Sequence, residues 1–375
     1  MKKGKRLGFV LCLILMFALL VSGCGQQGGK DAASRAEQVP VINMGYIFTT
    51  HHAPFIVAMA KGEDFKEMGT YLKEVVPKEK YELIEDGKKV ADVNVVVTKS
   101  GSETATLFAQ GNLDIALSSV TAFMTGIDKG TEVKVISPLQ AEGIAVVFPQ
   151  KSNIKDWDAF AGYLAESPNP VKIGYHSPTS APKIVFEAAL KSQGLKVTED
   201  PNDSTADVLL VDLKGTSNFI PAMNSKQVDG VVAPAPFPNV AEVQGVGKIA
   251  FQIADMPPEG RWVNVPCCVM GARDEVMADN PAVVKAMVKL MSNVSKWCND
   301  NAKEAADITA EWIGVPPEAA ENSVIVYSTD PNADWMRGIE TFLDSLNQMG
   351  KLNGELKDKK LEEVKDILFD FSFLR

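Results

Sequence analysis

The sequence predicts an α/β protein built from two related lobes. Strand-like apolar runs alternate with helical segments from residue 41 onward, a pattern typical of α/β proteins with mainly parallel sheets. Residues 101–119 and 215–234 also follow one plan: a glycine and a hydroxyl residue open a helix, and Asp114 or Asp229 then precedes an apolar strand. The repeat favours two lobes of common design, and the length of the chain is sufficient for two domains.

The N-terminus predicts an export signal rather than a permanent membrane span. Four basic residues precede an apolar stretch at 7–23, and such a stretch with basic flanks is typical of a cleaved signal. Its ending, "LVSGC", resembles the bacterial lipobox, which implies cleavage before Cys24 and lipidation of that cysteine; an ordinary cleaved signal is the alternative. We therefore expect a signal peptide at 1–23. A flexible tether is expected at 24–40, which is polar, Gly-rich and aperiodic.

The net charge argues against some partners. The full chain carries −10 at pH 7, and loss of residues 1–23, with four basic and no acidic residues, leaves −14. An acidic surface argues against nucleic acid or anionic lipid as the main partner. Membrane attachment would then depend on the lipid at Cys24.

The elements expected in the first series alternate between strand and helix. Apolar runs rich in β-branched residues predict the strands, and helical periodicity predicts the helices. In the first series these are strands at 41–47, 91–99 and 113–119, helices at 53–69, 100–112 and 120–130, and an extended run at 133–149.

A second series of the same kind follows, and the remainder of the chain is mostly helical. It comprises helices at 153–164, 180–195 and 215–227, strands at 170–176, 207–213 and 228–236, an extended run at 263–273, and helices from 280–298 to 354–369.

The two extended runs, near 135–148 and 263–271, are interpreted as the crossings between the lobes. The boundaries that follow are 41–139 for the first part of lobe 1, 140–266 for lobe 2, and 267–375 for the second part of lobe 1 with the C-terminal helices.

Polar loops follow several strands in both series, and they form the candidate ligand site. In open α/β sheets ligands bind beyond the carboxyl ends of the strands, where helix N-termini offer free N–H groups. A single hydroxyl residue at such a place often serves only as an N-cap, so the prediction depends on the number of these loops in both lobes. The residues expected to contact ligand are Phe48, His51, His52, Ser100, Ser102, Ser118, Ser119, Gln140, Tyr175, His176, Ser177, Thr179, Ser180 and Pro234.

Four segments, in this order, carry a resemblance to a known family: "GYIFTTHHAPFIVAMAKGEDFKEMG", "LFAQGNLDIALSS", "VKIGYHSPTSAPK" and "KQVDGVVAPAPFP". They resemble the substrate-binding proteins of ABC importers for nitrate, taurine, alkanesulfonates and thiamine-precursor pyrimidines, over about residues 41–350. The resemblance implies a type II periplasmic binding protein fold, with two crossover strands, a ligand cleft between the lobes and hinged closure. Two departures leave the ligand open: the histidine pair is not general in the family, and Pro234, Ala235 and Pro236 stand where it has a tryptophan.

The three histidines stand in two of these loops, and metal binding, catalysis and ligand contact are the alternatives. A metal needs three or four converging ligands, and neighbouring His51 and His52 tend to diverge in an extended loop. His176 with Cys267 or Cys268 could complete a set, but no HxH, HxxxH or CxxC spacing supports it. No GxSxG-like motif supports catalysis, and the pyrimidine-precursor synthases that share this fold lack an export signal. We expect ligand contact, mainly from His52 and His176, with the alternative that a twist of the loop exchanges the roles of His51 and His52.

The cysteines beyond the signal, Cys267, Cys268 and Cys298, form neither a CxxC pair nor a disulfide framework. Adjacent cysteines rarely bond to each other because the ring strains the peptide. We interpret Cys267 and Cys268 as small apolar strand residues.

As a whole the sequence predicts an extracytoplasmic, lipid-anchored and monomeric solute-binding protein without cofactor or catalysis. It would deliver a small anionic or heteroaromatic compound to the permease and ATPase of an ABC importer. The alternatives are a sensor lipoprotein of the same fold that feeds a receptor and, less favoured, a metal-binding or pyrimidine-synthase-like protein. Sulfonate, carboxylate, nitrate and pyrimidine all remain open as ligands.

Overall fold

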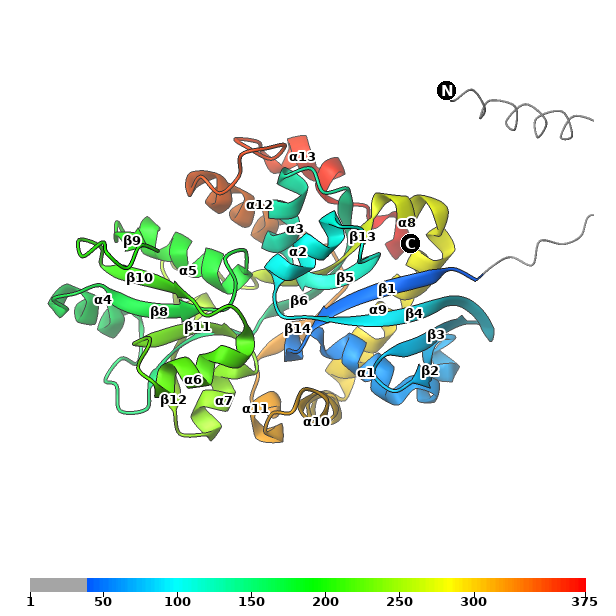
Figure 1. The fold of residues 1–375 in the computed structure, drawn as a ribbon, viewed down its shortest axis with the longest axis horizontal. Helices are drawn as coiled ribbons and strands as arrows, with labels where there is room; N and C mark the ends of the chain where they lie inside the picture. The colour runs from blue at the N-terminus through cyan, green and yellow to red at the C-terminus, as the bar shows by residue number, and fades with distance from the viewer. Residues whose placement is uncertain (1–38) are drawn as a thin grey trace, which may run out of the picture. The chain divides into compact units, whose positions relative to one another are not determined.

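Two β-sheets form the centre of the protein, and helices pack against them (Figure 1). The structure is a computed structural model and describes residues 39–375. The expected signal peptide, Cys24 and nearly all of the tether lie outside the described residues. Two sheets joined by two crossings confirm the predicted two-lobed α/β fold; lobe 1 is named here for the first sheet and lobe 2 for the second.

The first sheet has eight strands in the order β14-β6-β13-β5-β1-β4-β3-β2. Strand β1 pairs in parallel with β4 and β5, and the other neighbours pair antiparallel. The strands are β1 (Val41–Ile47), β2 (Thr70–Val76), β3 (Lys80–Glu85), β4 (Lys88–Thr98), β5 (Ile115–Ser119), β6 (Val133–Glu142), β13 (Pro266–Arg273) and β14 (Ile325–Tyr327).

The second sheet has six strands in the order β12-β7-β11-β8-β10-β9. Strands β11, β8, β10 and β9 are parallel, whereas β7 pairs antiparallel with β11 and β12. The strands are β7 (Ile144–Pro149), β8 (Val171–Tyr175), β9 (Val197–Thr198), β10 (Val208–Asp212), β11 (Gly230–Pro234) and β12 (Gly247–Gln252).

Helices account for most of the remaining chain. The α-helices are α1 (Ala53–Lys61), α2 (Gly101–Ala109), α3 (Val120–Asp128), α4 (Trp157–Glu166), α5 (Ala181–Ser192), α6 (Phe219–Asn224), α7 (Phe237–Val243), α8 (Asp274–Asp279), α9 (Pro281–Asp300), α10 (Ala302–Ile313), α11 (Pro317–Glu321), α12 (Ala333–Gln348) and α13 (Leu361–Leu368). The 3-10 helices are η1 (Thr50–His52), η2 (Gly62–Met68), η3 (Thr216–Asn218), η4 (Ile253–Asp255) and η5 (Phe371–Leu374).

The expectation of mainly parallel sheets is wrong for the first sheet. Strands β2 and β3 form an antiparallel meander with β4, and this pair was absent from the expected elements. The turn between β3 and β4 is the dipeptide Asp86–Gly87, and both residues have positive φ, 48° and 76°. That conformation matches the right-handed twist of a hairpin, which is why Asp-Gly is a hairpin signal. The crossing strand β13 adds further antiparallel pairs, with β5 and β6.

The first crossing lies at Gly143, between β6 of the first sheet and β7 of the second. Its φ of +73° belongs to the left-handed region that favours glycine. The chain returns to the first sheet before β13. The exact lobe boundaries stay a prediction, but the extended run at 133–149 is two strands that meet at this glycine.

The internal repeat is confirmed by equivalent hydrogen bonds in the two lobes. Asp114 Oδ2 accepts from the Asn43 N–H at 2.8 Å, and Asp229 Oδ2 accepts from the Lys172 N–H at 2.8 Å. Each aspartate also donates its own N–H to the carbonyl of the same partner, at 3.0 and 2.8 Å. Each carboxylate therefore fixes the start of one strand of its sheet against the strand that follows the aspartate.

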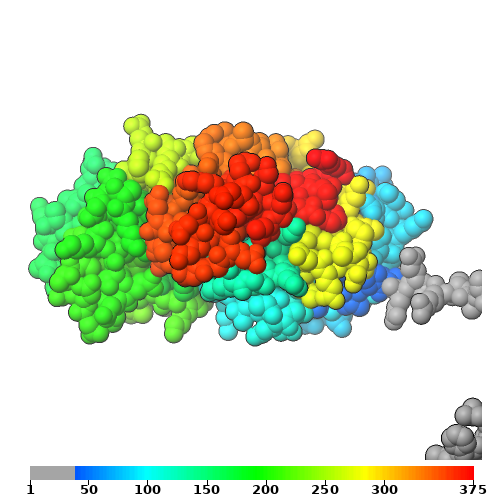
Figure 2. All heavy atoms as spheres, turned by 90° about the horizontal axis from the view of Figure 1, so that it is seen from above, coloured from blue at the N-terminus to red at the C-terminus, as the bar shows by residue number. Residues whose placement is uncertain are grey.

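The C-terminal helices connect the two lobes on one face. Helix α12 contacts α5 of lobe 2 and α3 of lobe 1, and Figure 2 shows the C-terminal segment across the middle of that face. Asp128, at the end of α3, accepts hydrogen bonds from the N–H groups of Asn353, Gly354 and Leu356 at 2.8 to 3.0 Å. In the described part of the chain, no helix has the length and apolarity needed to cross a membrane.

Candidate functional site

Hydroxyl side chains from both lobes meet where loops follow parallel strands. Ser102 Oγ, in the first turn of α2, lies 2.8 Å from Ser177 Oγ and 3.0 Å from Thr179 Oγ1 in the loop between β8 and α5. Ser119 and Thr121, at the start of α3, donate to the Thr179 carbonyl at 3.2 and 2.6 Å. The predicted loops of the two lobes are therefore in direct contact.

Helix N-termini in both lobes point their first turns at these loops. Ser119 caps α3 by accepting from the Ala122 N–H, and Ser100 caps α2 by accepting from the Glu103 N–H, both at 3.3 Å. Ser180 stands at the N-cap of α5 but makes no side-chain cap; its hydroxyl donates to the Ser177 carbonyl at 2.8 Å. Ser100 thus has a structural role, and the first turn of α5 keeps unsatisfied N–H groups.

Three residues of the predicted site have buried polar atoms without a hydrogen-bond partner among the described residues. They include Ser118 Oγ from lobe 1 and His176 Nδ1 from lobe 2, and these residues are 1% and 6% exposed. Burial lowers the pKa of His176 to about 3, with a smaller effect of His51, so the imidazole is neutral at pH 7. A buried polar atom without a partner costs about 1–3 kcal/mol, so a ligand that pairs with both atoms would gain from them.

His51 and His52 lie in different surroundings, and their expected ranking stays a prediction. His52 is fully buried: its Nδ1 accepts the Ile47 N–H at 2.9 Å, which fixes the end of β1, and its Nε2 has no hydrogen-bond partner among the described residues. His51 instead faces the crossing strands. The reason is that the loop is a 3-10 helix, η1, rather than an extended segment, so the two side chains diverge in another direction than the sequence suggested.

His51 lies at the contact between the lobes. Its Nε2 is 2.9 Å from the Gly143 carbonyl oxygen, which also accepts the Ala235 N–H at 2.7 Å. Thr49 Oγ1 accepts the His51 N–H at 3.2 Å and donates to the Ala235 carbonyl at 2.6 Å. Since a carbonyl oxygen only accepts, His51 Nε2 carries the ring proton, and Nδ1 presents a lone pair.

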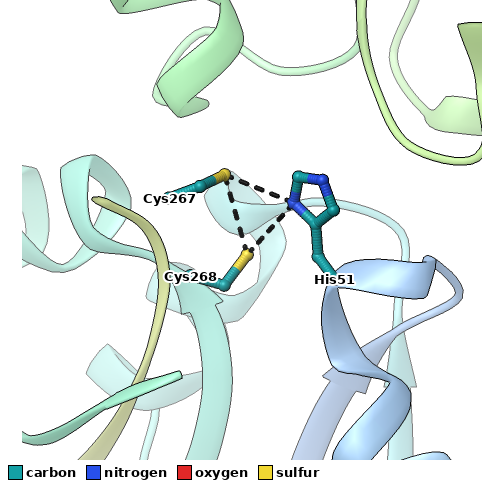
Figure 3. Close-up of side chains that lie close together, drawn as sticks. All are labelled: His51, Cys267 and Cys268. Carbon is teal, nitrogen blue, oxygen red and sulfur yellow. Dashed lines mark hydrogen bonds between the residues drawn. The ribbon is translucent and has the colours of Figure 1, made fainter. Parts of the chain in front are cut away.

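Two thiols face that lone pair. Cys267 Sγ and Cys268 Sγ lie 3.4 and 3.8 Å from His51 Nδ1, and 3.9 Å from each other (Figure 3). All three cysteines of residues 39–375 are free thiols. The hydrogen bond with Cys268 lowers the pKa of the Cys267 thiol, whereas burial raises that of Cys268. The interpretation of both cysteines as apolar strand residues therefore accounts for their burial but not for this convergence.

Of the remaining predicted contact residues, some lie beside the thiols and others have a role in the fold. Gln140 Oε1 accepts the Cys268 N–H at 3.1 Å, so it supports the thiol pair. The hydroxyl of Tyr175 donates to Glu199 at 3.0 Å, which uses its polar atom in a network with buried Lys183. Phe48 is partly exposed, and Pro234 ends β11 in the core. Ligand contact by all fourteen residues stays a prediction.

A cavity lies beside η1, next to Thr50. It has a volume of about 300 Å³, and Thr50, Cys298, Lys303, Glu321 and Tyr327 are among its lining residues. None of the fourteen predicted contact residues lines it, and Tyr327 closes one side by donating to the Thr50 carbonyl at 2.7 Å. It is distinct from the hydroxyl loops that join the lobes.

The amino-acid sequence is similar to one protein family and to a curated protein. Residues 35–314 match the model of the NMT1-like family. An uncharacterized protein of Methanocaldococcus jannaschii is 36% identical over 140 residues, which are 37% of this chain and 92% of that protein.

Solved structures show the same fold at low identity. The periplasmic nitrate-binding protein of Synechocystis superposes with a TM-score of 0.66 at 18% identity and covers 90% of this chain and 88% of its own. A ligand-binding component of an ABC-type import system from Staphylococcus aureus, described with zinc bound, gives 0.65 at 17% identity, with 89% and 97% covered. The alkanesulfonate-binding protein of Xanthomonas axonopodis pv. citri, bound to MOPS, gives 0.61 at 12% identity, with 84% and 95% covered.

These likenesses agree with the two sheets, the two crossings and the helical C-terminal region described above. The model match spans well over half of the chain, and the solved structures of the same fold include a nitrate-binding protein, an alkanesulfonate-binding protein and a ligand-binding component of an ABC-type import system. The chain belongs to the NMT1-like family and has the fold of the periplasmic binding proteins.

Proposed function

We propose that this protein is the extracytoplasmic solute-binding lipoprotein of an ABC importer. It would capture a small anionic or heteroaromatic organic compound and deliver it to the permease, with no catalysis of its own. The family match and the nitrate- and sulfonate-binding relatives support the class of function. Attachment would occur through a lipid on Cys24, on the outer face of the membrane, and the protein would act as a monomer.

One observation carries the proposal. Ser118 Oγ of lobe 1 and His176 Nδ1 of lobe 2 are buried without a partner in the described structure, next to loops whose hydroxyl groups join the lobes. A ligand that accepts and donates hydrogen bonds there would satisfy atoms of both lobes at once. Binding would thus be strongest when the lobes are in contact, as the hinged mechanism of this fold requires.

The chemistry of the loops favours a ligand with a polar head and an apolar body. None of the fourteen predicted contact residues has a fixed charge, so an anionic group would be held by hydroxyls and by the uncapped first turn of α5. Aromatic rings adjoin this region: the His176 ring lies 5.9 Å from that of Phe219, which in turn lies 5.8 Å from Phe237. Such a mixture suits a sulfonate or carboxylate on an organic body, or a polar heterocycle.

Calorimetry on the purified mature protein tests the site, with nitrate, taurine, an alkanesulfonate, an aromatic carboxylate and an aminopyrimidine as ligands. For the ligand that binds, Ser118→Ala and His176→Ala should each weaken affinity by about ten- to a hundredfold, as expected for one lost hydrogen bond to a polar ligand. The control is Ser295→Ala on α9, which removes another buried hydroxyl without a partner. Unchanged affinity in both site variants, with the fold intact, would place the ligand elsewhere.

A further inference from the structure

Three side chains that can bind a metal ion converge from segments far apart in the sequence. His51 belongs to η1, whereas Cys267 and Cys268 belong to β13, and the three residues are 1%, 2% and 5% exposed. Their ligand atoms, one nitrogen and two sulfurs, all lie within 4.8 Å of one another (Figure 3).

The separations match those of ligands on one metal ion. In a tetrahedral site with Zn–S bonds of about 2.3 Å and a Zn–N bond of about 2.0 Å, the sulfurs lie about 3.8 Å apart and each lies about 3.5 Å from the nitrogen. The observed separations are 3.9 Å between the sulfurs and 3.4 and 3.8 Å from sulfur to nitrogen. An ion could therefore be bound with only small movements of the side chains.

An irregularity in β13 makes this convergence possible. Successive side chains of a regular strand point to opposite faces, so adjacent cysteines would diverge. The pairing of β13 with β6 shifts register on both sides of Cys268, as a β-bulge does. Gln140 holds the shifted backbone by accepting the Cys268 N–H at 3.1 Å, and both thiols then face the imidazole.

The other ring nitrogen is oriented as in a metal-bound histidine. Metal-binding histidines commonly donate their second N–H to a carbonyl or carboxylate, which fixes the tautomer and the ring plane. His51 Nε2 has this partner in the Gly143 carbonyl, at 2.9 Å. The lone pair of Nδ1 is thereby directed at the sulfurs before any ion is present.

We propose that His51, Cys267 and Cys268 form a binding site for one thiophilic metal ion, with Zn²⁺ as the probe, and leave one coordination position open. Two thiolates and an imidazole are ligands that such ions prefer. Binding releases the thiol protons to solvent and forms two metal–sulfur bonds and one metal–nitrogen bond, without oxidation or reduction. The alternative use of such residues, a nucleophilic cysteine activated by a histidine, needs only one thiol beside the imidazole. Here two thiols face the same nitrogen, which favours metal binding. The proposal does not depend on the identity of the imported solute.

The test uses the reduced mature protein, freed of metal with a chelator and titrated with Zn²⁺ against a chromophoric chelator. We expect one ion per chain, and at least a hundredfold weaker affinity for Cys267→Ser, Cys268→Ser and His51→Asn. Cys298→Ser is the matched control, since Cys298 is equally buried but lies alone on α9; it should bind like the wild type. Circular dichroism and unfolding curves establish that each variant folds.

A second measurement keeps the test independent of the variants. Co²⁺ bound to the wild-type protein should show sulfur-to-cobalt charge-transfer absorption that Zn²⁺ abolishes. The proposed site would be overturned if the reduced wild-type protein did not bind Zn²⁺ stoichiometrically. It would also be overturned if Cys298→Ser lost as much affinity for Zn²⁺ as the variants of the three proposed ligands. Titrations without organic solute keep this result separate from any failure of solute binding.

Discussion

Replacement of Gly143 by alanine should destabilise the protein by about 2.5–4.5 kcal/mol. Its φ of +73° costs an L-residue about 1–2 kcal/mol. A Cβ there would lie 2.8 Å from His51 Nε2 and 2.9 Å from Ile325 Cγ1, so the imidazole must turn away from the Gly143 carbonyl and give up a hydrogen bond worth about 0.5–1.5 kcal/mol. The movement of Ile325 adds an overpacking cost of about 1 kcal/mol.

Urea unfolding with linear extrapolation measures this loss, and Gly130→Ala is the control. Gly130 has a similar φ of +84° but nothing within 4 Å of a built Cβ, so only the backbone cost of about 1–2 kcal/mol should be seen. In a His51→Ala background the difference between the two substitutions should shrink, because one of the two contacts is gone. Equal losses for Gly143→Ala and Gly130→Ala in the wild-type background would refute the close packing of His51 on the crossing.

Two further predictions concern pH and anchoring. Burial lowers the pKa of His176 from 6.5 to about 3. The contribution of the neutral imidazole to stability is therefore complete above pH 6.5 and is lost as the pH falls toward 3, at up to about 1.4 kcal/mol per pH unit. His176→Gln should flatten that part of the stability–pH curve, and an unchanged curve would show that His176 does not titrate in this way. Cys24→Ala should abolish lipid labelling and release the exported protein from the membrane fraction, and labelling that persists in the variant would contradict the anchor at Cys24.

Most strands and helices of the two series followed from the sequence because apolar runs and helical periodicity alternate in a regular order. The strand at 41–47 and the aspartates that precede β5 and β11 were found by pattern alone, and the fold followed from their order. The β2–β3 pair was missed although a signal existed, since Asp86–Gly87 is a two-residue hairpin turn. Strand β2 does not alternate apolar and polar residues and is exposed over its last four positions, and β3 alternates only over residues 80–83, so neither strand shows a long strand pattern.

The cluster of His51 with two thiols could not be predicted, because it depends on geometry that the sequence does not state. His51 and Cys267 are 216 positions apart, and the ordinary alternation of a strand implies that adjacent cysteines diverge. Only the register shift at Cys268 reverses this. The directions of the His51 and His52 side chains depend in the same way on whether the loop is extended or, as observed, a 3-10 helix.

The carbonyl of Gly143 accepts one hydrogen bond from His51 in lobe 1 and another from Ala235 in lobe 2. A cation at His51 Nδ1 makes the Nε2–H a stronger donor, so it favours the arrangement in which this acceptor is within reach. By thermodynamic linkage, separation of the lobes would weaken the affinity of Nδ1 for the cation. Binding of the cation would disfavour separation of the lobes by the same factor. A fluorescent label pair placed across the lobes would therefore report occupancy of the imidazole by the cation, and the difference in cation affinity between the closed and the separated lobes would report the coupling free energy of binding and closure.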